Sequence, residues 1–144
     1  MSVLLLIATT EVQFLFFIKS IDYHIIVWYY NSVRRIEKMT KQEYVALGKA
    51  LAIAKEKAMA FANYDDGGTC NFDSPIIQLK GTSEKTLEKW FSQYGVYKVY
   101  NDGWYIIGCR VLYGQGYRRT KMAEEFADTM KQLGYTCYVH YVMD

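Results

Sequence analysis

The stretch VYKVYNDGWYII, residues 96–107, carries the clearest local signal for the fold. Two runs rich in aromatic and β-branched residues flank Asn101, Asp102 and Gly103. An Asp-Gly pair between two such runs is typical of a β-hairpin, because both residues tolerate the positive φ of a tight turn. The sequence therefore predicts two strands, residues 96–100 and residues 104–113.

A helix is predicted on each side of this hairpin, with one short strand beyond each helix. Ser83 is suited to cap the start of the first helix, and Gly95 provides its left-handed stop. The second helix is predicted over residues 120–133, where apolar residues recur at helical spacing. The outer strands are predicted at residues 76–79 and 135–142.

Read in order, residues 72–142 give strand, helix, strand, strand, helix and strand, the split βαβ pattern of ferredoxin-like domains. A further helix precedes it, because Thr40 and Glu43 form a capping box before an amphipathic stripe. The sequence thus predicts an α+β fold, a ferredoxin-like βαββαβ domain with one additional N-terminal helix. We expect the first and third strands to be neighbouring and parallel at the centre of the sheet.

Residues 1–38 differ in composition from the rest, since all 10 glycines of the chain lie after them. The apolar run 3–18 is shorter than the roughly 20 residues of a membrane-spanning helix, and Glu11 and Gln13 stand at its middle. We interpret residues 1–38 as an N-terminal extension outside the core fold, and residues 39–144 as a single α+β domain. A membrane-associating segment and an added core element are the alternatives, and we expect no stable membrane insertion.

Composition narrows the classes of function. A formal net charge of +2 over 144 residues gives no general attraction to nucleic acid or to an anionic membrane, so any anion site must come from local charge. The 3 cysteines are widely spaced and match neither a disulfide framework nor a metal-ligand pattern. We expect a reduced, cytoplasmic protein without a cofactor.

Local charge gathers in two loops that lead into helices, residues 79–85 and 113–121. Parallel first and third strands would bring both loops, and both positive helix ends, to one end of the sheet. Arginine there suits a phosphate-like anion because it donates two hydrogen bonds at once. One alternative is that the glycines merely turn the chain, while the arginines solvate the surface or pair with Glu124 and Glu125; another is a surface that binds a protein partner. The residues predicted to bind the anion are Lys80, Thr82, Ser83, Gly114, Gln115, Gly116, Arg118, Arg119 and Thr120.

A second candidate site lies at the opposite end of the expected fold. Cys70, His140 and either Asp73 or Asp144 could approach one another there, as a thiol nucleophile, its base and an orienting carboxylate. The same set could hold a metal, although neither spacing is diagnostic and we expect no metal. A small cysteine-dependent hydrolase or transferase is therefore the alternative function.

Aromatic residues are frequent on the predicted strands. RNA-recognition domains stack bases on such residues, but residues 104–113 do not match the K/R-G-F/Y-G/A-F-V-x-F/Y pattern of those domains. Packing in the core or in an oligomer is the preferred interpretation. The residues concerned are Tyr97, Tyr100, Trp104, Tyr105, Tyr113, Tyr135, Tyr138 and Tyr141.

The strings DGGTCNFDSP (66–75), GQGYRRT (114–120) and YVHYVMD (138–144) resemble those of small, mostly uncharacterised accessory proteins of phages and integrative elements of Gram-positive gut bacteria. The resemblance implies an accessory role, in some cases inhibition of host defence by binding a nuclease complex, as anti-CRISPR proteins do, or by sequestering a nucleotide signal. The combined hypothesis is a small non-enzymatic protein whose exposed tyrosines or alanine-rich first helix could support an oligomer. Its basic helix-start end would contact a phosphate-bearing small molecule or a nucleic-acid-handling host protein.

Overall fold

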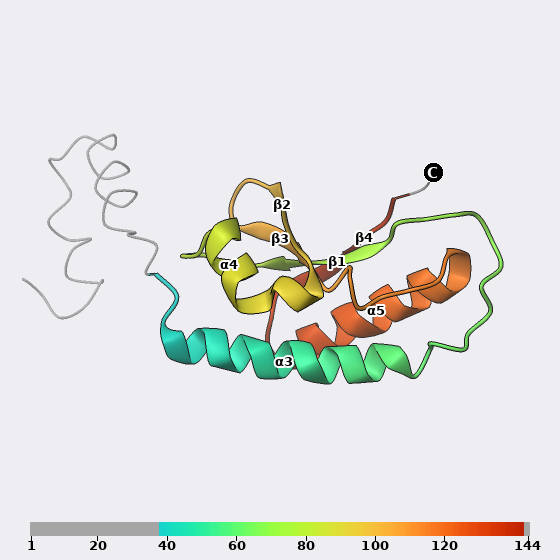
Figure 1. Ribbon diagram of the computed structural model, residues 1–144, viewed down its shortest axis with the longest axis horizontal. Helices are drawn as coiled ribbons and strands as arrows, with labels where there is room; N and C mark the ends of the chain where they lie inside the picture. Colours follow the sequence, from blue (N-terminus) through green and yellow to red (C-terminus); the bar gives the residue numbers. More distant parts are fainter. Residues whose placement is uncertain (1–37, 143–144) are drawn as a thin grey trace, which may run out of the picture. The chain divides into compact units, whose positions relative to one another are not determined.

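The computed structural model describes residues 38–142 (Figure 1). The interpretation of residues 1–37 as an extension or a membrane-associating segment lies outside the described residues. Within the described part, no helix has both the length and the apolar character needed to cross a membrane. The elements are α3 (Lys41–Met59), β1 (Ser74–Gln78), α4 (Glu84–Phe91), the 3-10 helix η2 (Ser92–Tyr94), β2 (Val96–Tyr100), β3 (Trp104–Ile107), α5 (Gly116–Gln132) and β4 (Cys137–His140).

The predicted α+β class is confirmed, as is the additional helix α3 before the first strand. The four strands form one sheet in the order β2-β3-β1-β4, with every neighbouring pair antiparallel. The prediction that the first and third strands are parallel is wrong, since Ile77 of β1 faces Tyr105 of β3 in antiparallel register. The crossover through α4 makes β2 run in the same direction as β1. The tight hairpin turn then reverses the chain, so that β3 runs opposite to β1.

The antiparallel pairing of β1 and β3 decides which loops are neighbours. Gln78 at the end of β1 lies opposite Trp104 at the start of β3. The loop that follows β1 therefore meets the hairpin turn, where the Leu79 amide donates to the Gly103 carbonyl at 2.7 Å. Gly103 has φ 77°, and a Cβ there would collide with the Leu79 carbonyl, so only glycine suits this contact. The loop that follows β3 starts from the opposite end of the sheet.

Local signals explain the helix ends that were predicted correctly. Thr40 and Glu43 form the expected capping box of α3, with the Thr40 amide 2.6 Å from Glu43 Oε2. Ser83 Oγ accepts from the Thr86 amide at the start of α4. Gly95 has φ 72° after η2, as its predicted role as a stop requires.

Two boundaries differ from the prediction. Strand β3 ends at Ile107 rather than at residue 113, because Gly108 takes φ 117° and its amide turns to the carbonyl of Tyr94. Helix α5 begins at Gly116 rather than at Thr120, because a loop distant in the sequence caps its first turn.

The core lies on one face of the sheet. Ile77, Tyr105 and Ile107 point into it from the strands, and all three helices contribute buried residues to the same cluster. Helices α3 and α5 lie side by side along that face (Figure 1). The strand residues that alternate with the buried ones point to the other face.

Candidate functional site

The face of the sheet turned away from the core carries a group of aromatic side chains, called here the aromatic face. The strand register puts its members on the same side as Ile76 and Ile106, which form the half-buried floor. Exposure is high for large apolar side chains, at 50% for Tyr100 and 54% for Tyr138. The members of the aromatic face are Tyr97, Tyr100, Trp104, Tyr138 and His140.

The rings of the aromatic face hold one another in place across the sheet. Trp104 of β3 contacts Tyr138 of β4, with ring centroids 5.8 Å apart and an interplanar angle of 42°. Tyr100 of β2 meets His140 of β4 edge to face at 5.9 Å, and the Tyr100 hydroxyl lies 3.2 Å from His140 Nδ1. Such pairs contribute about 0.5–1.5 kcal/mol each beyond simple burial. The exposed rings are therefore positioned before any ligand binds.

The strands that carry these rings contain no acidic side chain, since no residue of the described strands β1 to β4 is an aspartate or a glutamate. Lys131 Nζ lies 5.4 Å from the centre of the Tyr138 ring, a cation–π contact, and the hydrogen bond that Lys131 donates to Asp128 raises the pKa of Lys131. The arrangement can stack flat rings, and the ammonium beside them is shared with Asp128.

The residues predicted to bind an anion do not form one site. Lys80, Thr82 and Ser83 follow β1 and lie with the hairpin turn, whereas residues 114–120 follow β3 at the other end of the sheet. The cause is the antiparallel direction of β3. The single basic end expected from parallel strands therefore does not exist.

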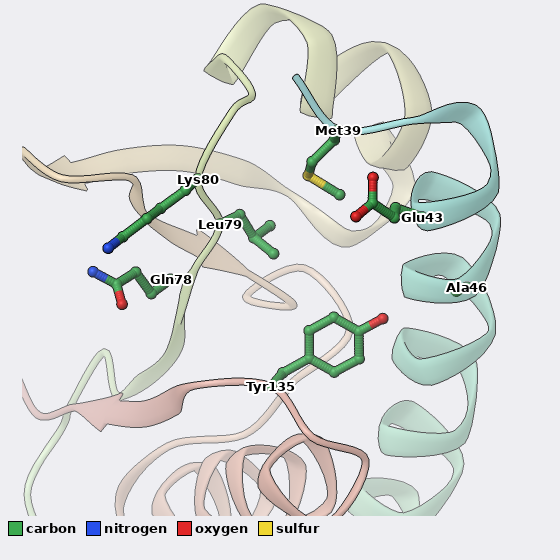
Figure 2. Close-up of a pocket in the computed structure, with 7 residues that line it drawn as sticks. All are labelled: Met39, Glu43, Ala46, Gln78, Leu79, Lys80 and Tyr135. Carbon is green, nitrogen blue, oxygen red and sulfur yellow. The ribbon is translucent and has the colours of Figure 1, made fainter. Parts of the chain in front are cut away.

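At the hairpin end, two of the three predicted residues have internal roles. The Thr82 hydroxyl lies 2.6 Å from the Tyr44 hydroxyl, the Thr82 carbonyl accepts from Tyr105, and Ser83 caps α4. Lys80 lines a cleft of about 330 Å³ between the start of α3 and the end of β1. Figure 2 shows Lys80 and Gln78 on one side of this cleft, opposite Glu43 of α3. The carboxylate of Glu43 is engaged in the capping box.

At the start of α5, the chain supplies the anion itself. Asp66 Oδ1 accepts from the Gln115 amide, and Asp66 Oδ2 lies 3.6 Å from Arg118 Nη1. Next to it, the Gly67 carbonyl accepts from the Tyr117 amide at 2.9 Å. A Cβ at Gly116 would collide with the Gly67 carbonyl, so this glycine permits the close approach of the two loops. The helix start for which the sequence predicts a phosphate-like anion thus binds a carboxylate of the same chain.

Arg119 also has an internal role. Its guanidinium donates to the carbonyls of Leu112 at 2.6 Å, Asp73 at 2.8 Å and Cys109 at 3.3 Å, and to Ser74 Oγ at 3.3 Å. Burial lowers the pKa of Arg119, although a guanidinium stays charged in proteins. The arginine ties the β3–α5 loop to the start of β1.

The residues of the alternative cysteine site are engaged elsewhere. Asp73 is 2% exposed, and its carboxylate accepts from Thr120 Oγ1 at 2.7 Å, Asn71 Nδ2 at 3.0 Å and the Val142 amide at 3.0 Å. His140 contacts Tyr100, and no hydrogen bond among the described residues joins Cys70 to His140 or to Asp73. Asp144 lies outside the described residues. Within residues 38–142, no group of three or more His, Cys, Asp or Glu side chains is arranged to hold a metal ion.

The reactivity of Cys137 on β4 gives a direct check of how deeply its thiol is buried. Burial raises the pKa of the Cys137 thiol to about 12. At pH 8 only about one Cys137 thiol in 10,000 is then ionised, and the thiolate is the reactive form. We expect iodoacetamide to modify Cys137 at least about 100-fold more slowly in the native protein than in urea. Mass spectrometry of timed samples would measure this, and rapid native labelling of Cys137 would contradict the buried position.

The aromatic face was only partly visible in the sequence. Tyr97 and Tyr100 are three residues apart, which in a regular strand would put them on opposite faces. A bulge between Lys98 and Tyr100 shifts the register and brings both to the same face. Tyr105, by contrast, points into the core, and Tyr113, Tyr135 and Tyr141 lie outside the strands.

Comparisons of the chain with protein-family models, with curated proteins and with solved structures give no match. A function is therefore inferred from the residues of this chain and their geometry.

Proposed function

We propose that this chain is a non-enzymatic binding protein whose aromatic face stacks the bases of a single-stranded nucleic acid. The observation that carries the proposal is the set of exposed rings from β2 and β4, with the half-buried Trp104 of β3 between them, on one face of a four-stranded sheet whose strands contain no carboxylate. Four-stranded sheets with exposed aromatics hold two or three unstacked bases in this way. The proposed ligand still carries phosphate, as expected from the sequence. It would bind at the aromatic face rather than at the basic helix starts.

The energy of such binding comes mainly from stacking. Each base stacked on an aromatic side chain contributes about 1–3 kcal/mol. Among the described residues, the cation in contact with these rings is Lys131, over Tyr138, whereas the register puts Lys98 opposite Tyr105, on the other side of β2. We therefore expect a shallow salt dependence, with the logarithm of the affinity falling by about one or two units per tenfold rise in salt.

Fluorescence anisotropy would test the proposal with labelled single strands of about ten nucleotides. RNA, DNA and a duplex of the same sequence would be titrated with the full chain at about 50 and about 200 mM salt. We expect both single strands to bind and the duplex to bind at least about tenfold more weakly, because its bases are already stacked. Equal binding of duplex and single strands, or no binding at all, would rule out the aromatic face as a base platform.

We further propose that the domain is ferredoxin-like. Read from β4, the strand order is β4-β1-β3-β2, and α4 and α5 connect β1 to β2 and β3 to β4, which supports this assignment. An experimental structure with α4 and α5 on opposite faces of the sheet would contradict it.

For the biological role, we propose an accessory protein of a phage or mobile element that inhibits host defence in the cytoplasm. The support is the resemblance of residues 66–75, 114–120 and 138–144 to such proteins, together with three free cysteines. Binding of a guide or target strand, or of the nuclease that handles it, would be the means. Plaque counts on a host with an active CRISPR system, with and without the expressed chain, would test this role separately from nucleic-acid binding.

A further inference from the structure

The two edges of the sheet differ in how their free backbone groups are treated. At the β2 edge, the outward amide of Lys98 donates to Glu84 Oε1 at 3.2 Å, and the bulge between Lys98 and Tyr100 interrupts the strand. Charged side chains and bulges are devices that prevent pairing at exposed sheet edges. Strand β2 is therefore protected against addition of another strand.

The residues of β4 itself carry no such protection, although Lys131 of α5 reaches the Tyr138 ring beside this edge. Hydrogen bonds from the Gln78 amide to the Thr136 carbonyl and from the Phe72 amide to the Val142 carbonyl establish which residues of β4 face β1. By the alternation of antiparallel ladders, the amide and carbonyl of Val139 point away from β1. Among residues 38–142, no strand pairs with this side of β4, which contains no lysine, proline or bulge.

A groove of about 340 Å³ runs along this edge between β4 and α5. Side chains of opposite charge lie at the two ends of the groove. At one end Glu124 Oε1 accepts from the Tyr141 hydroxyl, and at the other Lys131 lies over the Tyr138 ring. Asp128 stands between them and forms a hydrogen bond with Lys131 at 3.0 Å. The carboxylate of Glu124 and the ammonium of Lys131 thus lie near opposite ends of β4.

We infer that a second copy of this chain pairs with β4, so that two sheets join through antiparallel β4 strands. A two-fold axis beside Val139 places the Tyr141 end of one β4 against the start of the other. Glu124, which pairs with Lys121 in its own chain at 2.8 Å, then lies next to Lys131 of the partner copy, which pairs with Asp128 at 3.0 Å, so that each copy brings one acidic and one basic pair to the other. The unpaired backbone row, the lack of edge protection in β4 itself and this arrangement of charges together select a second copy as the occupant.

The mass of the full chain in solution tests the inference without any nucleic acid, so that its failure is separate from a failure of the proposed function. Light scattering after size exclusion, over a concentration series in the micromolar range, should give twice the 16.8 kDa of one chain. Val139→Pro removes an amide that the domain does not use internally and should give a monomer with an unchanged circular dichroism spectrum. A wild-type monomer overturns the inference, whether its β4 edge is free or covered by residues 1–37.

A charge exchange provides a second test that does not depend on tolerance of proline. Glu124→Lys and Lys131→Glu each place like charges across the two-fold axis and should weaken dimerisation by about tenfold or more. The double variant restores opposite charges and should return to within about threefold of the wild-type dissociation constant. Single variants that dimerise normally, or a double variant no better than the singles, would overturn the proposed pairing.

Discussion

Replacement of Arg119 by methionine is expected to lower the free energy of unfolding by about 2–4 kcal/mol. The substitution removes the donor to four acceptors, three of them backbone carbonyls in part-buried positions. Part-buried acceptors without a partner cost about 1–3 kcal/mol each when fully desolvated, and remaining contact with water reduces the sum. Because domains of this size have a total stability of about 5–15 kcal/mol, the loss is large. Urea denaturation followed by circular dichroism would measure it.

Arg118→Met is the matched control for this experiment. Arg118 is the neighbouring arginine, but it donates to one carbonyl only, that of Tyr64, and its ion pair with Asp66 is partly exposed, a kind of pair that contributes about 0–1 kcal/mol. Arg119→Lys should recover little of the stability, because an ammonium cannot reproduce the fork of a guanidinium across several acceptors. Equal losses for Arg118→Met and Arg119→Met would show that the network around Arg119 does not support the fold. That result would be expected if the role of Arg119 were to bind a ligand rather than to stabilise the fold.

Replacement of Trp104 by alanine is expected to weaken binding of a single-stranded oligonucleotide by about 10–100-fold, which corresponds to about 1.4–2.8 kcal/mol. Trp104 is itself a stacking surface, and it also positions Tyr138, whose ring centroid lies 5.8 Å away. The loss for Trp104→Ala combined with Tyr138→Ala should therefore be smaller than the sum of the single losses. Anisotropy titrations with the same labelled strand would give all three dissociation constants.

Trp90→Ala is the control of the same residue type. Trp90 is 37% exposed and stacks on Tyr44 at 5.2 Å, but it belongs to α4 rather than to the aromatic face. Its replacement should leave the dissociation constant unchanged within about twofold, once circular dichroism has shown that the variant is folded. If Trp90→Ala weakens binding as much as Trp104→Ala, the nucleic acid does not bind at the aromatic face.

The sequence was sufficient for the elements whose signals are local. Asp102 and Gly103 adopt the positive φ that their pair predicted, and the capping box of Thr40 with Glu43 begins α3 at the expected residue. These features depend on contacts within three or four residues. Their physical cause is therefore present in the sequence itself.

The aromatic face could be predicted only in part, because it depends on how strands far apart in the sequence pair with one another. The direction of β3 relative to β1 decides which loops share an end of the sheet, and the predicted crossover and hairpin together already require these strands to be antiparallel. The bulge after Lys98 hid the common face of Tyr97 and Tyr100. The cap of α5 was equally hidden, because Asp66 lies 49 residues before the amide that it accepts from.

The capping of α5 by the loop around Asp66 also has a kinetic consequence. A helix start that depends on a partner 49 residues away cannot be completed by local folding, since the entropy of closing that long segment must be overcome first. The first turn of α5 is thus expected to form late, after α3 and the remainder of α5 have already met. Disturbing Asp66 or Gly116 should accordingly hasten unfolding more than it slows refolding.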